Sequence, residues 1–139
     1  MHSEHLTNVQ FSWVAFGWFI AVAAASGILL LMEGSGLLGR SEAMDALSIA
    51  IAVALGWGIG GFLAGFRVAA APILHGSAIA LLSFVAWFIL NLTVGGLSSG
   101  TAAWEPLTVR TAALGLLVQG GAAILGAWLG YRMAPVRVK

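Results

Sequence analysis

Residues 53–67 read Val-Ala-Leu-Gly-Trp-Gly-Ile-Gly-Gly-Phe-Leu-Ala-Gly-Phe-Arg, an uncharged, glycine-rich stretch that closes on an arginine. The stretch ends an apolar run from Met44 to Phe66, and similar runs extend from Ser12 to Met32, Pro72 to Val94 and Leu107 to Met133. At about 1.5 Å per residue, about 20 residues cross a hydrocarbon core of about 30 Å, so each run predicts a transmembrane helix. Continuous apolarity lacks the alternation of barrel strands. We therefore expect an all-α, integral membrane four-helix bundle.

The composition supports this prediction and excludes several classes of protein. Hydrophobic residues make up 60% of the chain and charged residues 8%, too few charges to cover a water-soluble domain of 139 residues. The chain has no cysteine, and its net charge of +1 offers no basic face for nucleic acid. We expect one domain, residues 1–139, with membrane lipids as its surroundings and no nucleic-acid partner.

An internal repeat links the second and fourth runs. Gly61-Phe-Leu-Ala-Gly-Phe-Arg-Val-Ala69 returns 65 residues later as Gly126-Ala-Trp-Leu-Gly-Tyr-Arg-Met-Ala134. At the same offset Gly56 corresponds to Gly121. The first and third runs resemble each other more faintly. We interpret the chain as a duplicated helical hairpin whose halves are related by an approximate two-fold axis along the membrane normal.

The cations indicate an orientation. Arg67, Arg132, Arg137 and Lys139 fall on the side of the predicted bundle that carries both termini, whereas Arg40 and Arg110 fall on the other. Because cytoplasmic loops carry the excess of Lys and Arg, we expect both termini in the cytoplasm. A location in the bacterial inner membrane is implied by the resemblance described below.

Glycine spacing predicts how the helices pack, since small residues let helix backbones approach closely in lipid. At 100° per residue, Gly56 and Gly60 form one groove of the second helix, and Gly58, Gly61 and Gly65 form another. We expect the second groove to face Gly126 and Gly130, a GxxxG pair, and the first to accept a helix of another protein. The predicted packing residues are Gly56, Gly58, Gly60, Gly61, Gly65, Gly115, Gly126 and Gly130.

Few polar residues fall within the four runs. Gln119 and Asn91 lie on small-residue stripes, which predicts that both are buried in protein contacts. Asp45 and Arg110 correspond at the 65-residue offset, so a salt bridge between the starts of the second and fourth helices is predicted as a structural latch.

His75 lies about one turn into the third helix and is followed by Gly76. A membrane histidine beside a small residue can ligate a chlorophyll-type pigment, which is the alternative to a cofactor-free protein. No second buried histidine exists for a bis-histidine haem, and we expect no metal site. No nucleophile is paired with a base, so we expect no catalytic residue and no enzyme.

Gly60-Gly-Phe-Leu-Ala-Gly-Phe-Arg67, followed by Leu74-His-Gly76, resembles the signature of small uncharacterised four-helix bacterial membrane proteins. This sequence departs from that pattern at Val68-Ala-Ala-Ala71, which replaces a basic turn. The resemblance implies a fold and a topology, and it implies no activity.

Two hypotheses of function follow. The first is a non-catalytic accessory or stabilising subunit of a larger membrane complex, respiratory or photosynthetic, with other membrane subunits as partners. The alternative is a small homo-oligomeric transporter or channel. The centres of the helices lack the ionisable groups that transport commonly uses, which favours the first hypothesis.

Overall fold

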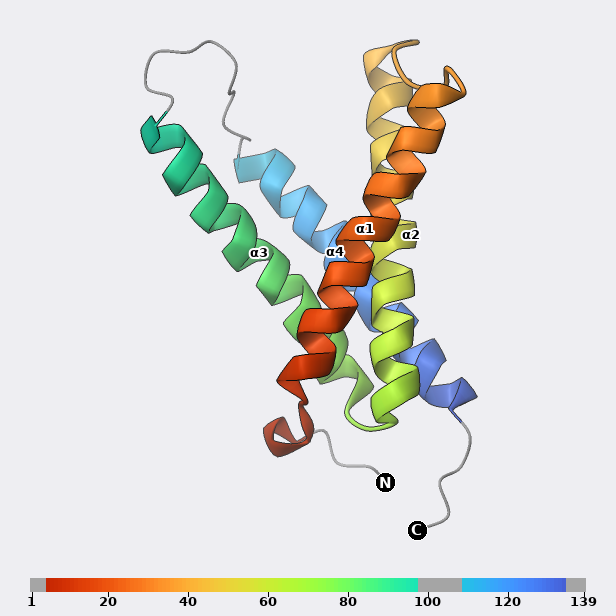
Figure 1. Cartoon of the computed structure of the whole chain (residues 1–139), viewed down its shortest axis with the longest axis vertical. Coiled ribbons are helices and arrows are strands. Elements are labelled where there is room, and N and C mark those ends of the chain that lie inside the picture. Colours follow the sequence, from red (N-terminus) through yellow and green to blue (C-terminus); the bar gives the residue numbers. More distant parts are fainter. Residues whose placement is uncertain (1–4, 98–108, 135–139) are drawn as a thin grey trace.

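The computed structural model describes residues 5–97 and 109–134. This part of the chain forms a short 3-10 helix, η1 (Leu6–Asn8), and four α-helices (Figure 1). The α-helices are α1 (Phe11–Gly34), α2 (Glu42–Val68), α3 (Pro72–Leu97) and α4 (Val109–Met133). All four are long and apolar enough to cross a membrane. The predicted all-α integral membrane fold is thus confirmed, and the observed helix ends lie at most three residues from the predicted ones.

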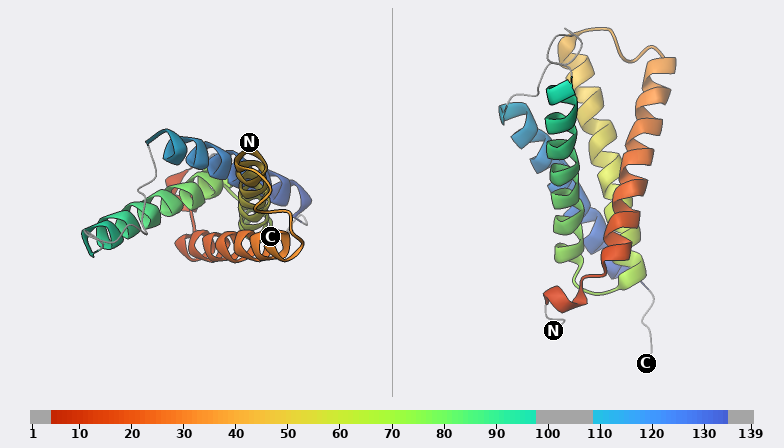
Figure 2. Two further views of the ribbon diagram at one scale, coloured as in Figure 1. Left: turned by 90° about the horizontal axis from the view of Figure 1, so that it is seen from above. Right: turned by 60° about the vertical axis from the view of Figure 1, so that its left-hand side comes forward.

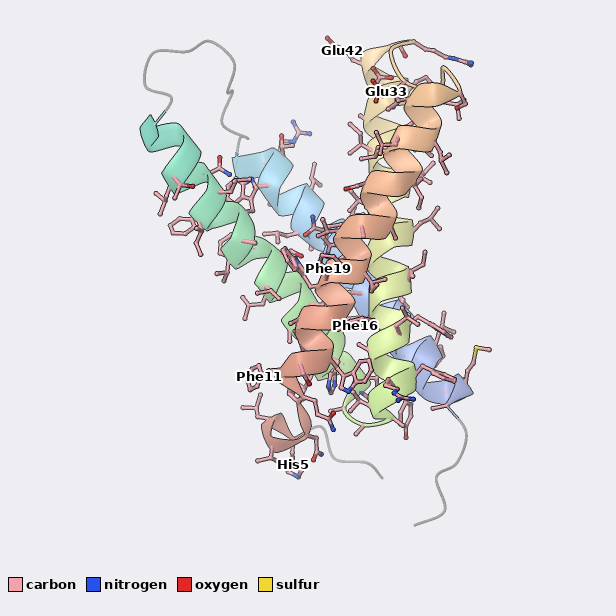
Figure 3. All side chains as sticks on the ribbon, in the orientation of Figure 1. His5, Phe11, Phe16, Phe19, Glu33 and Glu42 are labelled. Atoms are coloured by element: carbon pink, nitrogen blue, oxygen red, sulfur yellow. The ribbon has the colours of Figure 1, made fainter. Side chains whose placement is uncertain are left out.

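Charged and apolar side chains are distributed as a bilayer requires. Phe11, Phe16 and Phe19 lie along α1, and Phe11 and Phe19 are 80% and 64% exposed (Figure 3). Glu33 and Glu42 lie at one end of the molecule, and His5 lies at the other. Apolar side chains therefore cover the middle of the helices, where lipid replaces water, and charges lie at the ends.

Local interactions explain where several helices begin and end. The α1–α2 loop passes through Gly36 and Gly39, whose φ angles of +70° and +81° favour glycine. Ser41 caps α2, because its hydroxyl oxygen accepts a backbone N–H of the first turn at 3.3 Å. Ala69 ends α2 in the left-handed conformation with φ of 52°. Pro72 opens α3, where its missing N–H needs no partner.

The helices form a layered and splayed bundle. We call the side with the start of α1, the α2–α3 turn and the end of α4 the terminal side, and the side with the α1–α2 loop the loop side. Helix α2 lies between α1 and α4, whereas α3 packs chiefly on α4 (Figure 2). Helices α1 and α3 meet near the terminal side and separate toward the loop side (Figures 1 and 2). The two hairpins are therefore not arranged alike.

The core is small and built largely from alanine. Close helix packing in lipid rests on small residues rather than on a hydrophobic drive, so alanine and glycine occupy the positions that leucine takes in water-soluble bundles. The buried cluster consists of Val14, Ala21, Ala25, Trp57, Ala64, Ile79 and Ala123.

Candidate functional site

The contact between α2 and α4 is very close. A Cβ atom added to Gly61 or Gly65 would collide with the carbonyl oxygen of Ala123 or Ala127, respectively. Each collision involves backbone, which cannot yield without moving a helix. Gly61 and Gly65 therefore let α4 lie directly on α2, on the face that the sequence analysis assigned to this contact.

This contact is also symmetric under the sequence repeat. A Cβ added to Gly126 would meet the carbonyl of Gly58, and one added to Gly130 would meet the carbonyl of Phe62. Shifting these pairs by 65 residues converts them into the pairs made by Gly61 and Gly65 with α4. Such reciprocity is what a two-fold axis between two copies of one helix produces. The observed contact thus agrees with duplication of α2 and α4.

The other groove of α2 is filled by α1. A Cβ added to Gly56 would lie 2.6 Å from the carbonyl oxygen of Ala21 and 2.7 Å from the Cβ of Ala25. Gly60 faces Gly17 of α1 in the same way. The expectation that this groove accepts a helix of another protein is therefore corrected: both faces of α2 are occupied from within the chain.

The second hairpin lacks the equivalent of this α1–α2 contact. A Cβ added to Gly121, the repeat counterpart of Gly56, would have none of the described residues within 4 Å. Leu117 and Leu125 replace the counterparts Ala52 and Gly60, and they are 72% and 62% exposed. We call Leu117, Gly121 and Leu125 the open face of α4. These larger side chains keep a helix from approaching this face as closely as α1 approaches α2.

Helix α3 lies on a neighbouring face of α4. A Cβ on Gly76 would lie 2.5 Å from the Cα of Ile124, so α3 and α4 touch closely near the terminal side. Toward the loop side the contact loosens, and an added Cβ on Gly120 would lie 3.6 Å from the nearest atom, in Ala80. The contact therefore opens along the length of α3.

A partly enclosed cavity of about 90 Å³ lies where α3 and α4 separate. Its walls include Ser83 and Trp87 from α3, and Thr111, Gly115 and Gln119 from α4. Within residues 5–97 and 109–134, nothing lies within 4 Å of a Cβ added to Gly115, so this predicted packing glycine is not in contact with another described helix.

Gln119 is half-buried, and among the described residues its side chain has no hydrogen-bond partner. Its place on a small-residue stripe predicts a helix contact, whereas in the structure it lies in the cavity wall. Asn91 is also half-buried, but its amide donates to the carbonyl of Trp87 at 2.9 Å, one turn back in its own helix. An unpartnered amide at membrane depth costs free energy, so this fold leaves Gln119 unexplained, as it does the buried indole N–H of Trp18, which has no partner among the described residues.

A buried hydrogen bond joins α2 to α3 beside this cavity. The indole N–H of Trp57 donates to the hydroxyl oxygen of Ser83 at 2.9 Å, and that hydroxyl donates to the carbonyl of Ile79 at 3.1 Å. Both Trp57 and Ser83 are buried. This pair could not be predicted from the sequence, because donor and acceptor come from different helices and no spacing along the chain relates them.

His75 is fully buried and links three segments at the terminal side. Its Nδ1 lies 2.9 Å from the carbonyl oxygen of Ala71, and its Nε2 accepts the backbone N–H of Gln10 at 3.2 Å. The neutral ring with the proton on Nδ1 satisfies both bonds. In this arrangement Nε2 is turned to Gln10 rather than to an open space for a pigment, so the pigment alternative gains no support. Through these two hydrogen bonds, His75 connects the α2–α3 turn to the start of α1.

Asp45 and Arg110 are not brought together. The carboxylate of Asp45 accepts the backbone N–H of Gly39 at 2.8 Å, and Arg110 lies exposed at the start of α4. Among the described residues no ion pair joins the two. The predicted salt bridge is thus not supported, because α4 is tilted and its start lies away from the start of α2 (Figures 1 and 2).

Within the described ranges, no three His, Cys, Asp or Glu side chains come close enough to hold a metal ion. Arg137 and Lys139, used for the orientation, lie outside those ranges. Comparison with protein-family models, curated proteins and solved structures gives no match for this chain.

Proposed function

We propose that this integral membrane protein is a non-catalytic accessory subunit that holds a helix of a partner membrane protein against the open face of α4. The four helices are the scaffold, and the contact with the partner is the function. The proposal places the protein in a bacterial inner membrane with both termini in the cytoplasm, within a respiratory, photosynthetic or other membrane complex.

The proposal rests on a difference between the two hairpins. A helix face that the repeat places on both α2 and α4 is covered on α2 and uncovered on α4. In the first hairpin, α1 covers Gly56 and Gly60 of α2 within van der Waals distance. In the second, the corresponding open face of α4 is covered by no helix among the described residues, and Leu117 and Leu125 are exposed. A glycine in a helix costs about 1 kcal/mol relative to alanine, and Gly121 recovers none of this by packing against the residues that the structure describes.

The chemistry of the face favours a helix as its occupant. Leu117, Gly121 and Leu125 follow one another at near-helical spacing, with a small residue between two large ones. The two leucine side chains protrude, and Gly121 leaves a recess between them. In lipid, another helix would be stabilised on this surface by van der Waals contacts. Because leucine occupies the outer positions, the distance between α4 and the partner helix is larger than the distance between α1 and α2.

The orientation rests on the basic residues of the terminal side. Arg67 lies over the ring of Trp13 with its guanidinium carbon 5.5 Å from the centroid, and Arg132 lies 4.0 Å above the ring of Trp128. Arginine with tryptophan is typical of a membrane interface. Arg137 and Lys139 follow in sequence, which supports a cytoplasmic terminal side.

Site-specific photocrosslinking in the native membrane tests the proposal. A photoreactive amino acid at Leu117 should give one discrete adduct with another protein, identified by mass spectrometry. The control is the same probe at Leu81 of α3, which is 63% exposed but lies off the open face. Lipid adducts alone at Leu117 would refute the proposal. An adduct of twice the chain mass would favour the alternative of a homo-oligomeric transporter or channel, for which the cavity beside Gln119 is the candidate solute site.

A further inference from the structure

The cavity between α3 and α4 reaches from near the loop side to about mid-membrane. Thr111 lies one residue after Arg110 at the start of α4, and Gln119 lies eight residues after Thr111. Eight residues of α-helix correspond to about 12 Å, against a hydrocarbon core of about 30 Å. The cavity wall thus runs along two turns of α4 and ends at the Gln119 amide.

The lining is largely apolar, with side chains such as Phe84, Trp87 and Leu116, and it contains a few polar groups and no charged one. Gln119 offers two amide hydrogens and a carbonyl oxygen that no described residue pairs, whereas the Ser83 hydroxyl in the same wall is already bonded to Trp57 and to Ile79. None of the lining residues is ionisable. An ion would leave its hydration shell without gaining a countercharge, whereas a neutral molecule with both donor and acceptor groups would satisfy Gln119.

We propose that this cavity is a hydrated slot that binds small uncharged molecules able to donate and accept hydrogen bonds. Its volume of about 90 Å³ limits the size of the occupant. A cavity needs about 10–15 Å³ of such space to hold one water molecule, so the slot admits several waters or one small solute such as a primary amide. This site goes beyond the proposed partner contact, which uses a different face of α4.

Alkylation of single cysteines tests the slot, and the cysteine-free chain supplies a clean background. The variants Gly115→Cys and Gln119→Cys place a thiol in the wall, whereas Leu117→Cys places one at similar depth on the open face. Each full-length variant is reconstituted in phosphatidylcholine liposomes and treated with iodoacetamide. Because the thiolate is the nucleophile and forms only where water reaches it, we expect the two wall cysteines to react at least tenfold faster than Leu117→Cys.

A second arm distinguishes water from a bound solute. Excess acetamide should slow alkylation of Gly115→Cys at least threefold if the slot binds amides, and the added change Gln119→Leu should abolish this protection. Rapid alkylation without protection would mean that water is the occupant, which also supports a hydrated slot.

Equal, slow alkylation of Gly115→Cys, Gln119→Cys and Leu117→Cys would overturn the inference, since the slot would then be dry. Thermal melts of each variant check that the fold is kept, and Gly115 has open space for the added side chain. Photocrosslinking at Leu117 reports on the partner contact alone, so the two proposals can fail separately.

Discussion

The change Gly56→Ala, compared with Gly121→Ala, measures how much the α1–α2 contact depends on the missing side chain. The two glycines are repeat counterparts in α2 and α4, so the gain in helix propensity on adding a methyl group, up to about 1 kcal/mol, is shared and cancels in the comparison. The remaining difference in the free energy of unfolding therefore reports packing.

The structure sets the size of that difference. A Cβ at Gly56 would lie 2.6 Å from the Ala21 carbonyl oxygen, whereas ordinary contact begins at 3.4 Å. Helix α1 would have to move by about 0.8 Å, the difference between these distances. Overpacking of this kind costs about 1–3 kcal/mol. At Gly121 the added Cβ meets no atom of the described part of the chain within 4 Å. We therefore expect Gly56→Ala to be less stable than Gly121→Ala by about 1–3 kcal/mol.

Equilibrium unfolding in mixed micelles of a mild detergent and dodecyl sulfate, followed by far-ultraviolet circular dichroism, provides the assay. Wild type and both variants are measured at several dodecyl sulfate fractions. If Gly56→Ala and Gly121→Ala unfolded with the same free energy, α1 would not pack closely on α2, and the comparison of the two repeated faces would lose its basis.

Three further predictions concern single contacts. Trp57→Phe and Ser83→Ala should show a coupling energy of about 0.6 kcal/mol in a double-mutant cycle of unfolding, as for other membrane hydrogen bonds; strictly additive losses would deny the bond. His75→Phe should speed hydrogen exchange of the backbone amides at the start of α1, measured by mass spectrometry, because the variant lacks the ring nitrogen that accepts the Gln10 N–H. Unchanged protection of these amides would show that His75 does not hold the start of α1. A cysteine at His5 should be labelled by a membrane-impermeant reagent only from the cytoplasm, and one at Ser35 only from the opposite side; the reverse pattern would invert the orientation.

Most of the secondary structure could be predicted from sequence, because a transmembrane helix satisfies its own backbone and needs only a long apolar run. The α2–α4 contact could also be predicted, since Gly61 and Gly65 recur as Gly126 and Gly130 and small residues at four-residue spacing favour close approach. The candidate cavity could not be predicted from the sequence. Gln119 occupies a regular position on a small-residue stripe, and only the divergence of α3 from α4 turns that position into a cavity wall.

The sequence by itself thus determined four membrane-spanning helices, the repeat and which faces are narrow enough for close packing. Only the tertiary structure decided which helix fills each groove. Gly56 and Gly60 alone cannot tell whether α1 or a foreign helix lies against them, since any helix with small residues at matching depth would fit. Leu117 and Leu125 then keep the second hairpin from copying the first, and α3 settles on the adjacent face of α4. Helix formation is a local property of the chain, whereas the choice of neighbour depends on the competition among all four helices in one bilayer.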